Sequence, residues 1–292
     1  MLGWLNRFSK VYRTVSLTVL ALLTCFTIVA CTSAGTGGSG GDFPAELTFA
    51  TEDDYPPFDF LKDGKHVGYN QDMLDAVLEG APFKVKQEIV PWQGILAGVA
   101  SGKYAASNAA ASVLEERVKS VSFTMPTTEL TNYYVTRKGE SIKSIADFAG
   151  KNIGVQQGGA TAVMVDEVIK PELVKSGKDV GNVAQYGAFA EAYQDLENKR
   201  LDIVINNVVA LNQLVKTKPD VFEMGAQVGP TIYAGWTVNK GNTKLLEFLN
   251  TRIADLKANG KMKELQDKWL NVSFENLPNE PQLPGGKPVP AS

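Results

Sequence analysis

A short segment around Arg117 carries the residues whose chemistry is simplest to interpret. Residues 104–112 read Y-A-A-S-N-A-A-A-S, and Arg117 follows five positions after Ser112. Small side chains let a ligand approach the backbone, and a guanidinium can hold a carboxylate through two parallel charge-assisted hydrogen bonds. Taken alone, the segment is explained equally well if Arg117 is an ordinary surface arginine paired with Glu115 or Glu116. It predicts a carboxylate site if other parts of the chain converge on it.

Acidic and aromatic residues occupy a second position suited to a ligand. Residues 47–51 form a β-rich run, and Glu52, Asp53 and Tyr55 follow it before two prolines force a loop. Open α/β sheets place ligand groups just beyond the carboxyl ends of their strands. Trp92 begins an amphipathic segment. The alternatives are a solvated loop for the acids and ordinary core packing for Trp92.

Two further segments end predicted strands in polar residues. Residues 156–161 read Q-Q-G-G-A-T between a predicted strand and a predicted helix, so their backbone N–H groups could bind an anion. Their spacing matches neither a dinucleotide fingerprint nor a Walker loop, and a plain turn is the alternative. Asn206 and Asn207 follow the apolar run 201–205, and Asn207 could serve a site or only cap the strand end.

Composition argues against several kinds of site. The chain has 292 residues, a formal net charge of −3, one His and two Cys. A weakly acidic chain lacks the basic surface that binds nucleic acid, so no nucleic acid is expected. With so few His and Cys residues a metal site is not expected either, and no motif calls for a cofactor or a catalytic group.

The N-terminal residues predict export and lipid attachment. An apolar run at 15–30 follows basic residues and is too short for a transmembrane helix, but it suits a signal peptide. It ends I-V-A-C at Cys31, which resembles a bacterial lipobox; a plain signal peptide with an incidental cysteine is the alternative. We expect a signal peptide at 1–30, lipid on Cys31 and a Gly/Ser tether at 31–42.

The rest of the chain alternates between strand and helix patterns. Expected strands cover 47–51, 84–90, 121–123, 131–137, 152–155, 201–205 and 232–238. Expected helices begin with one capped by Asn70 and continue at 92–99, 145–148, 161–169, 189–198, 208–215, 243–259 and 262–270. This order predicts an α/β fold with mostly parallel sheets. His66 is expected in a solvated turn, and the Pro-rich tail 276–292 without regular structure.

Several segments in this order resemble the extracytoplasmic solute-binding proteins of polar amino acid ABC importers, of the type II periplasmic-binding-protein class. They are T-E-D-D-Y-P-P-F-D-F, G-Y-N-Q-D-M-L-D, W-Q-G-I-L-A-G-V-A-S-G-K-Y and E-E-R-V-K-S-V-S-F-T-M-P, followed by residues 147–161, 200–207 and 258–270. The resemblance implies two α/β lobes, each a mostly parallel sheet flanked by helices, joined by two hinge strands. It places the first lobe at 43–129 and 233–275 and the second at 130–232.

The resemblance also assigns ligand contacts. It implies that Arg117 holds an α-carboxylate, that Ser112 and Ala110 contact the amino acid group, and that Ala160 and Thr161 add backbone N–H groups. Tyr55 and Trp92 match aromatics that sandwich the ligand side chain. Glu52, Asp53 and Gln156 match positions that read its polar end.

Asn207 departs from the family pattern, which usually has an acid there to pair with the ligand ammonium. An amide offers an acceptor without charge. Either Glu52, Asp53 or Asp54 supplies the missing charge, or the ligand is an N-substituted amino acid, an opine-like compound or a carboxylate without an amine.

The resemblance implies a monomeric, lipid-anchored binding component that closes on an amino acid or related small carboxylate and docks on an ABC permease outside the cytoplasm. Two alternatives remain. One is an enzyme on the same scaffold, similar to cyclohexadienyl dehydratases, with Glu52 or Asp53 as general acid. The other is a ligand-sensing partner of a membrane receptor.

Overall fold

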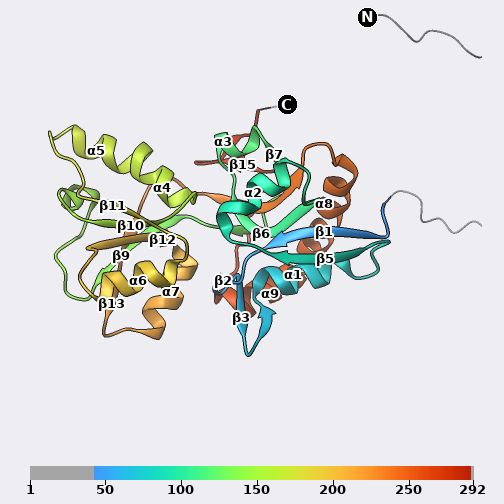
Figure 1. Ribbon diagram of the computed structural model, residues 1–292, viewed down its shortest axis with the longest axis horizontal. Coiled ribbons are helices and arrows are strands. Elements are labelled where there is room, and N and C mark those ends of the chain that lie inside the picture. Colours follow the sequence, from blue (N-terminus) through green and yellow to red (C-terminus); the bar gives the residue numbers. More distant parts are fainter. Residues whose placement is uncertain (1–42, 291–292) are drawn as a thin grey trace, which may run out of the picture. The chain divides into compact units, whose positions relative to one another are not determined.

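The computed structural model describes residues 43–290, which all lie within one compact unit of the chain. The expected signal peptide, the lipidated Cys31 and the tether at 31–42 lie outside the described residues. Within the described chain, two large sheets and their helices account for most of the fold (Figure 1).

The first sheet combines strands that run in one direction with a single strand that runs the opposite way. Its order is β5 (Lys84–Ile89), β1 (Glu46–Thr51), β6 (Ala106–Ser112), β14 (Tyr233–Asn239) and β7 (Val121–Phe123), and β8 (Thr128–Glu129) also pairs with β14. The strands β5, β1 and β6 are parallel, whereas β14 runs antiparallel to its neighbours. Every residue of the central strand β6 is buried, which explains its small side chains.

The second sheet repeats this plan. Its order is β11 (Val183–Tyr186), β10 (Ile153–Gln156), β12 (Ile203–Asn207), β9 (Asn132–Arg137) and β13 (Phe222–Gln227). The strands β11, β10 and β12 are parallel, and β9 is antiparallel to β12 and β13. The expectation of mostly parallel sheets is confirmed, because among the described strands β14 alone runs against the others in the first sheet and β9 alone in the second. Each of these two strands begins where the chain arrives from the other sheet.

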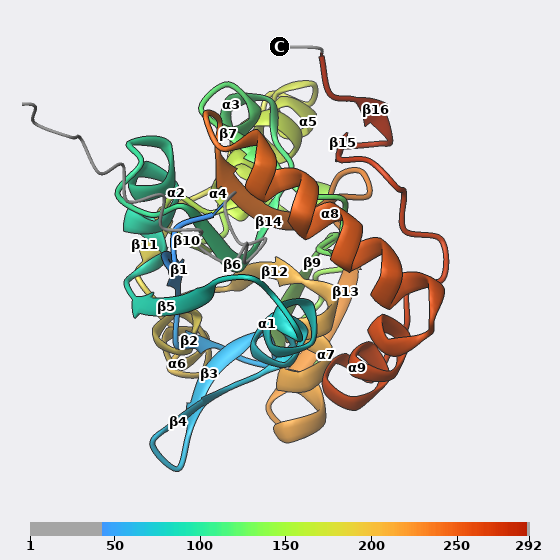
Figure 2. The same ribbon diagram turned by 90° about the vertical axis from the view of Figure 1, so that its right-hand side faces the viewer.

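Helices cover both faces of each sheet. Those associated with the first sheet are α1 (Tyr69–Leu78), α2 (Trp92–Ala100), α3 (Glu115–Val118), α8 (Thr243–Ala258) and α9 (Lys261–Leu270). Those of the second are η1 (Ile145–Phe148), α4 (Ala160–Met164), the π-helical η2 (Val165–Ile169), α5 (Lys170–Val174), α6 (Phe189–Glu197) and α7 (Val208–Thr217). Figure 2 shows α8 and α9 beside α1, which both of them contact.

Apolar side chains form a core on each face of each sheet. Residues of α1, α8 and α9 pack on one face of the first sheet, around Phe49 and Trp236, and α2 packs on the other around Ile95. In the second sheet, α4, η2 and α5 cover one face and α6 and α7 the other. These cores fix the strand ends from which the polar residues of the next section project.

The chain crosses between the sheets twice. It leaves the first sheet after β8 and returns to it at β14, and Leu130 N–H donates to the carbonyl oxygen of Ile232 at 2.8 Å where the crossings meet. A small sheet of β2 (Asp54–Tyr55), β3 (Asp59–Lys62) and β4 (Lys65–Val67) follows β1.

Asn70 is not the N-cap of the first helix, contrary to expectation. The cap is Gly68, at φ 136°, where a Cβ atom would lie 2.2 Å from the carbonyl oxygen of Phe58. The N–H groups of Tyr69 and Asn70 donate to loop carbonyls of Pro57 and Phe58. The loop thus satisfies the start of the helix, and the Asn70 side chain is left free for Asp59, to which its Nδ2 donates at 2.5 Å.

The Pro-rich tail also differs from expectation, because part of it is ordered. Strands β15 (Gln282–Leu283) and β16 (Lys287–Pro288) form a hairpin. Leu277 and Leu283 are each only 4% exposed, and Gly285 N–H donates to the carbonyl oxygen of Thr231 at 2.9 Å. Apolar side chains between the prolines let this segment pack even though its composition is typical of a disordered tail.

Candidate ligand site

One pocket gathers nearly all of the residues singled out from the sequence. It holds about 380 Å³ of space between atoms, part of which is open to solvent. Its lining includes Glu52, Tyr55, Trp92, Ala110, Ser112, Arg117, Gln156, Ala160, Thr161 and Asn207 from that set. These residues come from strand ends and adjacent turns of both sheets, as expected for open α/β sheets.

Arg117 is a buried base without an acidic partner. It lies in α3, just after β6, and is 9% exposed. Its Nη1 donates to the carbonyl oxygen of Ser112 at 3.1 Å, and its Nη2 donates to that of Gly158 at 3.0 Å. No carboxylate in residues 43–290 forms an ion pair with it. Burial lowers the pKa of the guanidinium to about 10, so it still carries its charge at neutral pH.

The glycine turn of the second sheet closes over this arginine. Trp92 Nε1 donates to the carbonyl oxygen of Gly158 at 3.2 Å, and the guanidinium carbon of Arg117 lies 5.2 Å from the Trp92 ring centroid. The hydroxyl of Thr161 accepts from the N–H of Gln156 at 3.1 Å, which holds the turn between β10 and α4. Gly158 has φ 67°, a conformation that favours glycine.

Tyr55 joins the two sheets on another wall of the pocket. Its hydroxyl donates to Asn206 Oδ1 at 2.9 Å and accepts from Asn207 Nδ2. Asn207 is also the N-cap of α7, because its Oδ1 accepts from Ala210 N–H at 3.0 Å. Asn206 Nδ2 donates to the hydroxyl of Tyr193 at 2.8 Å. The side-chain oxygen of Asn207, which the sequence suggested as an acceptor for a ligand amine, therefore already caps a helix.

An aromatic row stands beside this network. The rings of Phe58, Tyr55, Phe189 and Tyr193 stack in sequence, with centroid separations of 5.4, 5.6 and 6.0 Å. Phe189, at the start of α6, thus lies against the Tyr55 ring. Tyr55 and Trp92 both line the pocket, and the proposed sandwich of a ligand between them remains a prediction.

Glu52 is the pocket's acid, and it is only 2% exposed. Its Oε2 has no hydrogen-bond partner among the described residues. Burial, followed by repulsion from Asp59, Asp54 and Asp53, raises the pKa of the Glu52 carboxyl well above its ordinary value. A cationic ligand group placed against this carboxyl would favour its ionised form.

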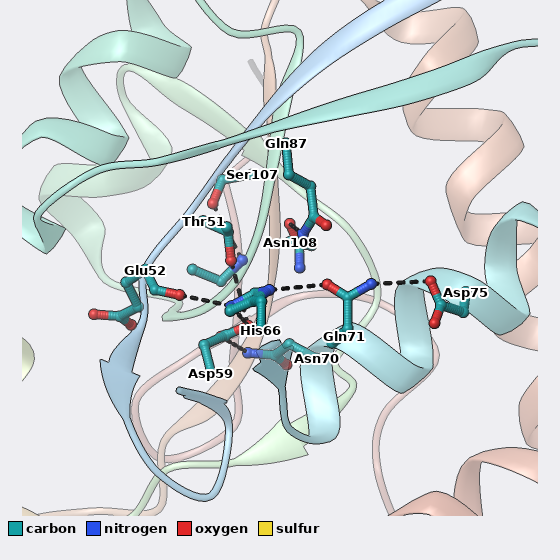
Figure 3. A network of polar contacts seen from close by, with 11 residues as sticks. Thr51, Glu52, Asp59, His66, Asn70, Gln71, Asp75, Gln87, Ser107 and Asn108 are labelled. Carbon is teal, nitrogen blue, oxygen red and sulfur yellow. Dashed lines mark hydrogen bonds and ion pairs between the residues drawn. The ribbon is translucent and has the colours of Figure 1, made fainter. Parts of the chain in front are cut away.

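A buried polar network lies behind Glu52 (Figure 3). Asp59, fully buried, accepts from Thr51 Oγ1 at 3.3 Å and from Asn70, and lies 3.6 Å from His66 Nε2. His66 also contacts the Glu52 carbonyl oxygen at 2.8 Å and Gln71 Oε1 at 3.0 Å. His66 is therefore packed against these groups rather than solvated as expected, because the β3–β4 hairpin folds it back toward β1.

Asp53 is the one predicted site residue that the structure does not bring to the pocket. Its side chain is not part of the pocket lining, which includes Glu52 and Tyr55 on either side of it in the chain. Its carbonyl oxygen accepts from Leu61 N–H at 3.1 Å. Asp54 is exposed and also lies outside this pocket. Of Glu52, Asp53 and Asp54, the three acids that could replace the charge missing at Asn207, Glu52 is therefore the one that lines the pocket.

No site role was predicted from the sequence for four lining residues: Leu130, Asn132, Phe189 and Asn206. Asn132 Nδ2 is buried without a partner, which makes it a second unsatisfied polar atom in the pocket. The one available signal was position, because Asn132 begins β9 directly after the chain crosses between the sheets and Asn206 precedes Asn207 at the end of β12.

Within residues 43–290, no cluster of three or more His, Cys, Asp or Glu side chains is placed to hold a metal ion. The helices of this part of the chain are all too short or too polar to span a membrane.

Comparison with known proteins places the chain in a family. Residues 47–272 match the model of the bacterial extracellular solute-binding proteins, family 3. An L-arginine-binding protein of Pseudomonas aeruginosa is 31% identical over 228 residues, covering 74% of this chain and 85% of the relative. An ABC transporter arginine-binding protein 1 of Escherichia coli is 26% identical over 259 residues, covering 87% and 98%. A solved ancestral arginine-binding protein bound to arginine superposes with a TM-score of 0.70 at 30% identity, covering 77% of this chain and 98% of that one.

The chain belongs to the bacterial extracellular solute-binding proteins of family 3. The class predicted from the ordered motifs is confirmed, as is the two-lobed α/β fold. The family is extracellular, which agrees with the predicted location outside the cytoplasm.

Proposed function

We propose that this protein captures an amino acid or a related small carboxylate for an ABC importer, with Arg117 as the carboxylate anchor. The observation that carries this proposal is a buried guanidinium that lines a pocket and, among residues 43–290, donates hydrogen bonds to carbonyl oxygens alone. A ligand carboxylate would replace these neutral acceptors with stronger charge-assisted ones. Relatives named for amino acids, arginine among them, support this ligand class.

Closure of two lobes would bury the ligand. The first lobe covers 43–129 and 233–275, the second 130–232, and the paired crossings near Leu130 and Ile232 act as the hinge. Contacts from Tyr55 to Asn206 and from Arg117 to Gly158 join the lobes and would form and break with the motion. Ser112, Ala110, Ala160 and Thr161 would complete the contacts to the amino acid group.

Delivery would follow from docking of the closed form on a membrane permease. A lipid on Cys31 would hold the monomeric protein near that permease, with residues 31–42 as a flexible tether. Labelling the expressed protein with a fatty acid, in parallel with Cys31→Ser, tests the anchor. Incorporation that persists in Cys31→Ser would contradict it.

Calorimetric titration tests the binding function. A thermal-shift screen of residues 43–292 against amino acids, N-modified amino acids and short carboxylates first identifies a ligand by the stabilisation it causes. Arg117→Ala is then expected to weaken binding at least a hundredfold, whereas Arg200→Ala, at an exposed arginine paired with Asp195, leaves it unchanged. Undiminished binding by Arg117→Ala would refute the proposal.

A second candidate, an enzyme on this scaffold, is favoured by one observation. Burial raises the Glu52 pKa, which would keep a proton available in the pocket for general acid catalysis. Incubation with prephenate or arogenate tests it. If the wild-type protein converts either compound and Glu52→Gln does not, the protein is an enzyme and not only a binding protein.

A further inference from the structure

The charged groups of the pocket are few and balanced. Among the described residues that line it, Arg117 is the only base and Glu52 the only acid. The remaining lining residues are apolar, hydroxyl, amide or glycine side chains. The pocket therefore offers a ligand one positive and one negative side chain. A buried ligand can therefore carry one negative and one positive group and find an opposite charge in the pocket for each of them.

The acids near Glu52 do not add a second negative group to the pocket. Asp59 is held behind the wall by Asn70 and Thr51 and faces His66 at 3.6 Å. Asp53 lies outside the lining and is partly exposed to solvent, which screens its charge. Figure 3 shows the Glu52 carboxylate turned away from His66 and Asp59. Its unpartnered Oε2 is the acidic atom left for a ligand.

The wall formed by Asn206 and Asn207 is neutral and already hydrogen-bonded. Asn207 Oδ1 accepts from Ala210 N–H, and Asn207 Nδ2 donates to Tyr55. Asn206 Oδ1 accepts from the Tyr55 hydroxyl and from Asn207 N–H at 2.7 Å. A ligand cation placed against this wall would find no opposite charge, and it would have to share acceptors that the protein already uses.

We propose, building on the binding function above, that the pocket selects ligands with no net charge, carrying one carboxylate for Arg117 and one cationic nitrogen for Glu52. Amino acids with uncharged side chains belong to this class, and so do basic amino acids whose α-nitrogen has been acylated. A free basic amino acid carries two cations, one of which would be buried without a counter-charge. An acidic amino acid would instead bury an unpaired carboxylate.

Titration calorimetry with matched ligands tests this inference. The panel contains the standard amino acids, with Nα-acetyl-L-arginine and L-arginine as a pair that differ in the charge of the α-nitrogen. The tightest ligand of the wild-type protein is expected to have no net charge. L-arginine is expected to bind at least tenfold more weakly than that ligand and more weakly than its acetylated form.

Asn207→Asp supplies the missing charge at a position that keeps its helix cap, because Asp and Asn are equally good N-caps. The variant is expected to bind L-arginine and L-lysine at least tenfold more tightly than wild type, with no such gain for uncharged amino acids. Circular dichroism checks that it folds, and Asn206→Asp adds the charge to the same wall if it does not.

Three results overturn the inference, and they separate it from the binding function. Wild-type protein that binds L-arginine or L-lysine most tightly contradicts the charge count but leaves the function intact. A folded Asn207→Asp or Asn206→Asp variant whose affinity for basic amino acids is no higher than that of wild type also contradicts the charge count and leaves the function intact. Failure of the whole panel to bind contradicts the function, and the inference with it.

Discussion

Arg117 Nη2 donates a hydrogen bond to the carbonyl oxygen of Gly158 at 3.0 Å. Arg117 follows the central strand of the first sheet, and Gly158 lies in the turn after β10 of the second. The contact therefore joins the two halves of the pocket through its only base. Because a carbonyl oxygen is a weaker partner than a carboxylate, this contact marks the place where a ligand is expected to enter.

Trp92→Phe tests the second bond to the same carbonyl. The substitution removes the Nε1 donor, 3.2 Å from the Gly158 oxygen, but leaves a ring beside the Arg117 guanidinium. Ligand binding is expected to weaken about three- to tenfold, the usual contribution of one neutral hydrogen bond. Calorimetry measures the change against Trp269→Phe, which removes a donor to Asp72 outside the pocket. Equal losses in the two variants would contradict the assigned role.

Tyr55→Phe tests the tie between the sheets. The ring can keep its stacking on Phe58 and Phe189, but the hydroxyl bonds to Asn206 and Asn207 are lost. We expect binding to weaken about tenfold, because closure loses two hydrogen bonds of about 1 kcal/mol each and the two amides rearrange in part. Tyr186→Phe, which removes a bond to Asp195 within the second sheet's own helices and strands, is the control. A normal affinity in Tyr55→Phe would show that this tie is not used in closure.

Stability should depend on pH through Asp59. Burial raises the pKa of its carboxyl from 3.8 to about 7. Between these values the unfolded chain has released a proton that the folded protein still holds, so this group's contribution to stability falls as pH rises from about 4 to about 7. Burial also raises the pKa of Glu52, so its contribution to stability likewise falls as pH rises.

Urea unfolding of the unliganded protein across this pH range measures the effect. Asp59→Asn keeps an acceptor for Asn70 but cannot ionise, so its stability relative to wild type should increase with pH. A difference between the two proteins that stays constant from pH 4 to pH 7 would mean that Asp59 does not hold its proton in the fold.

The C-terminal hairpin should contribute to stability. Leu283 is 4% exposed and packs in the core cluster that contains Val121 and Phe123. Leu283→Ala is expected to lower the free energy of unfolding by about 2 kcal/mol, the lower end for a buried leucine. Leu61→Ala, at a side chain 50% exposed, should cost at most about 0.5 kcal/mol. Chemical denaturation of both variants checks this, and equal effects would place Leu283 outside the folded core.

Much of the site was predictable because its residues follow strand ends in a recognisable order. Glu52 directly follows β1, which the sequence predicted as a strand. The run of small residues at 104–112 drew attention to Ser112 and Arg117, although β6 itself was not among the expected strands. Strands β11 and β13 were missed because they are partly exposed and carry mixed polar and apolar residues, so their periodicity is weak.

The rest of the site depends on packing between distant segments. Phe189 reaches the pocket by stacking on Tyr55, and nothing local to α6 indicates that partner. Asn132 becomes part of the wall only because the chain crosses between the sheets at this point. Asp53 illustrates the opposite error, since it directly follows Glu52 in the chain but does not line the pocket that Glu52 lines.

A crystal structure of the protein with the ligand found by screening would show directly whether Arg117 binds the ligand carboxylate. We expect a ligand carboxylate about 2.7–2.9 Å from both Nη1 and Nη2 of Arg117, with Gly158 released from its present bond. A bound ligand whose carboxylate lies elsewhere, with Arg117 still donating to Gly158, would contradict it.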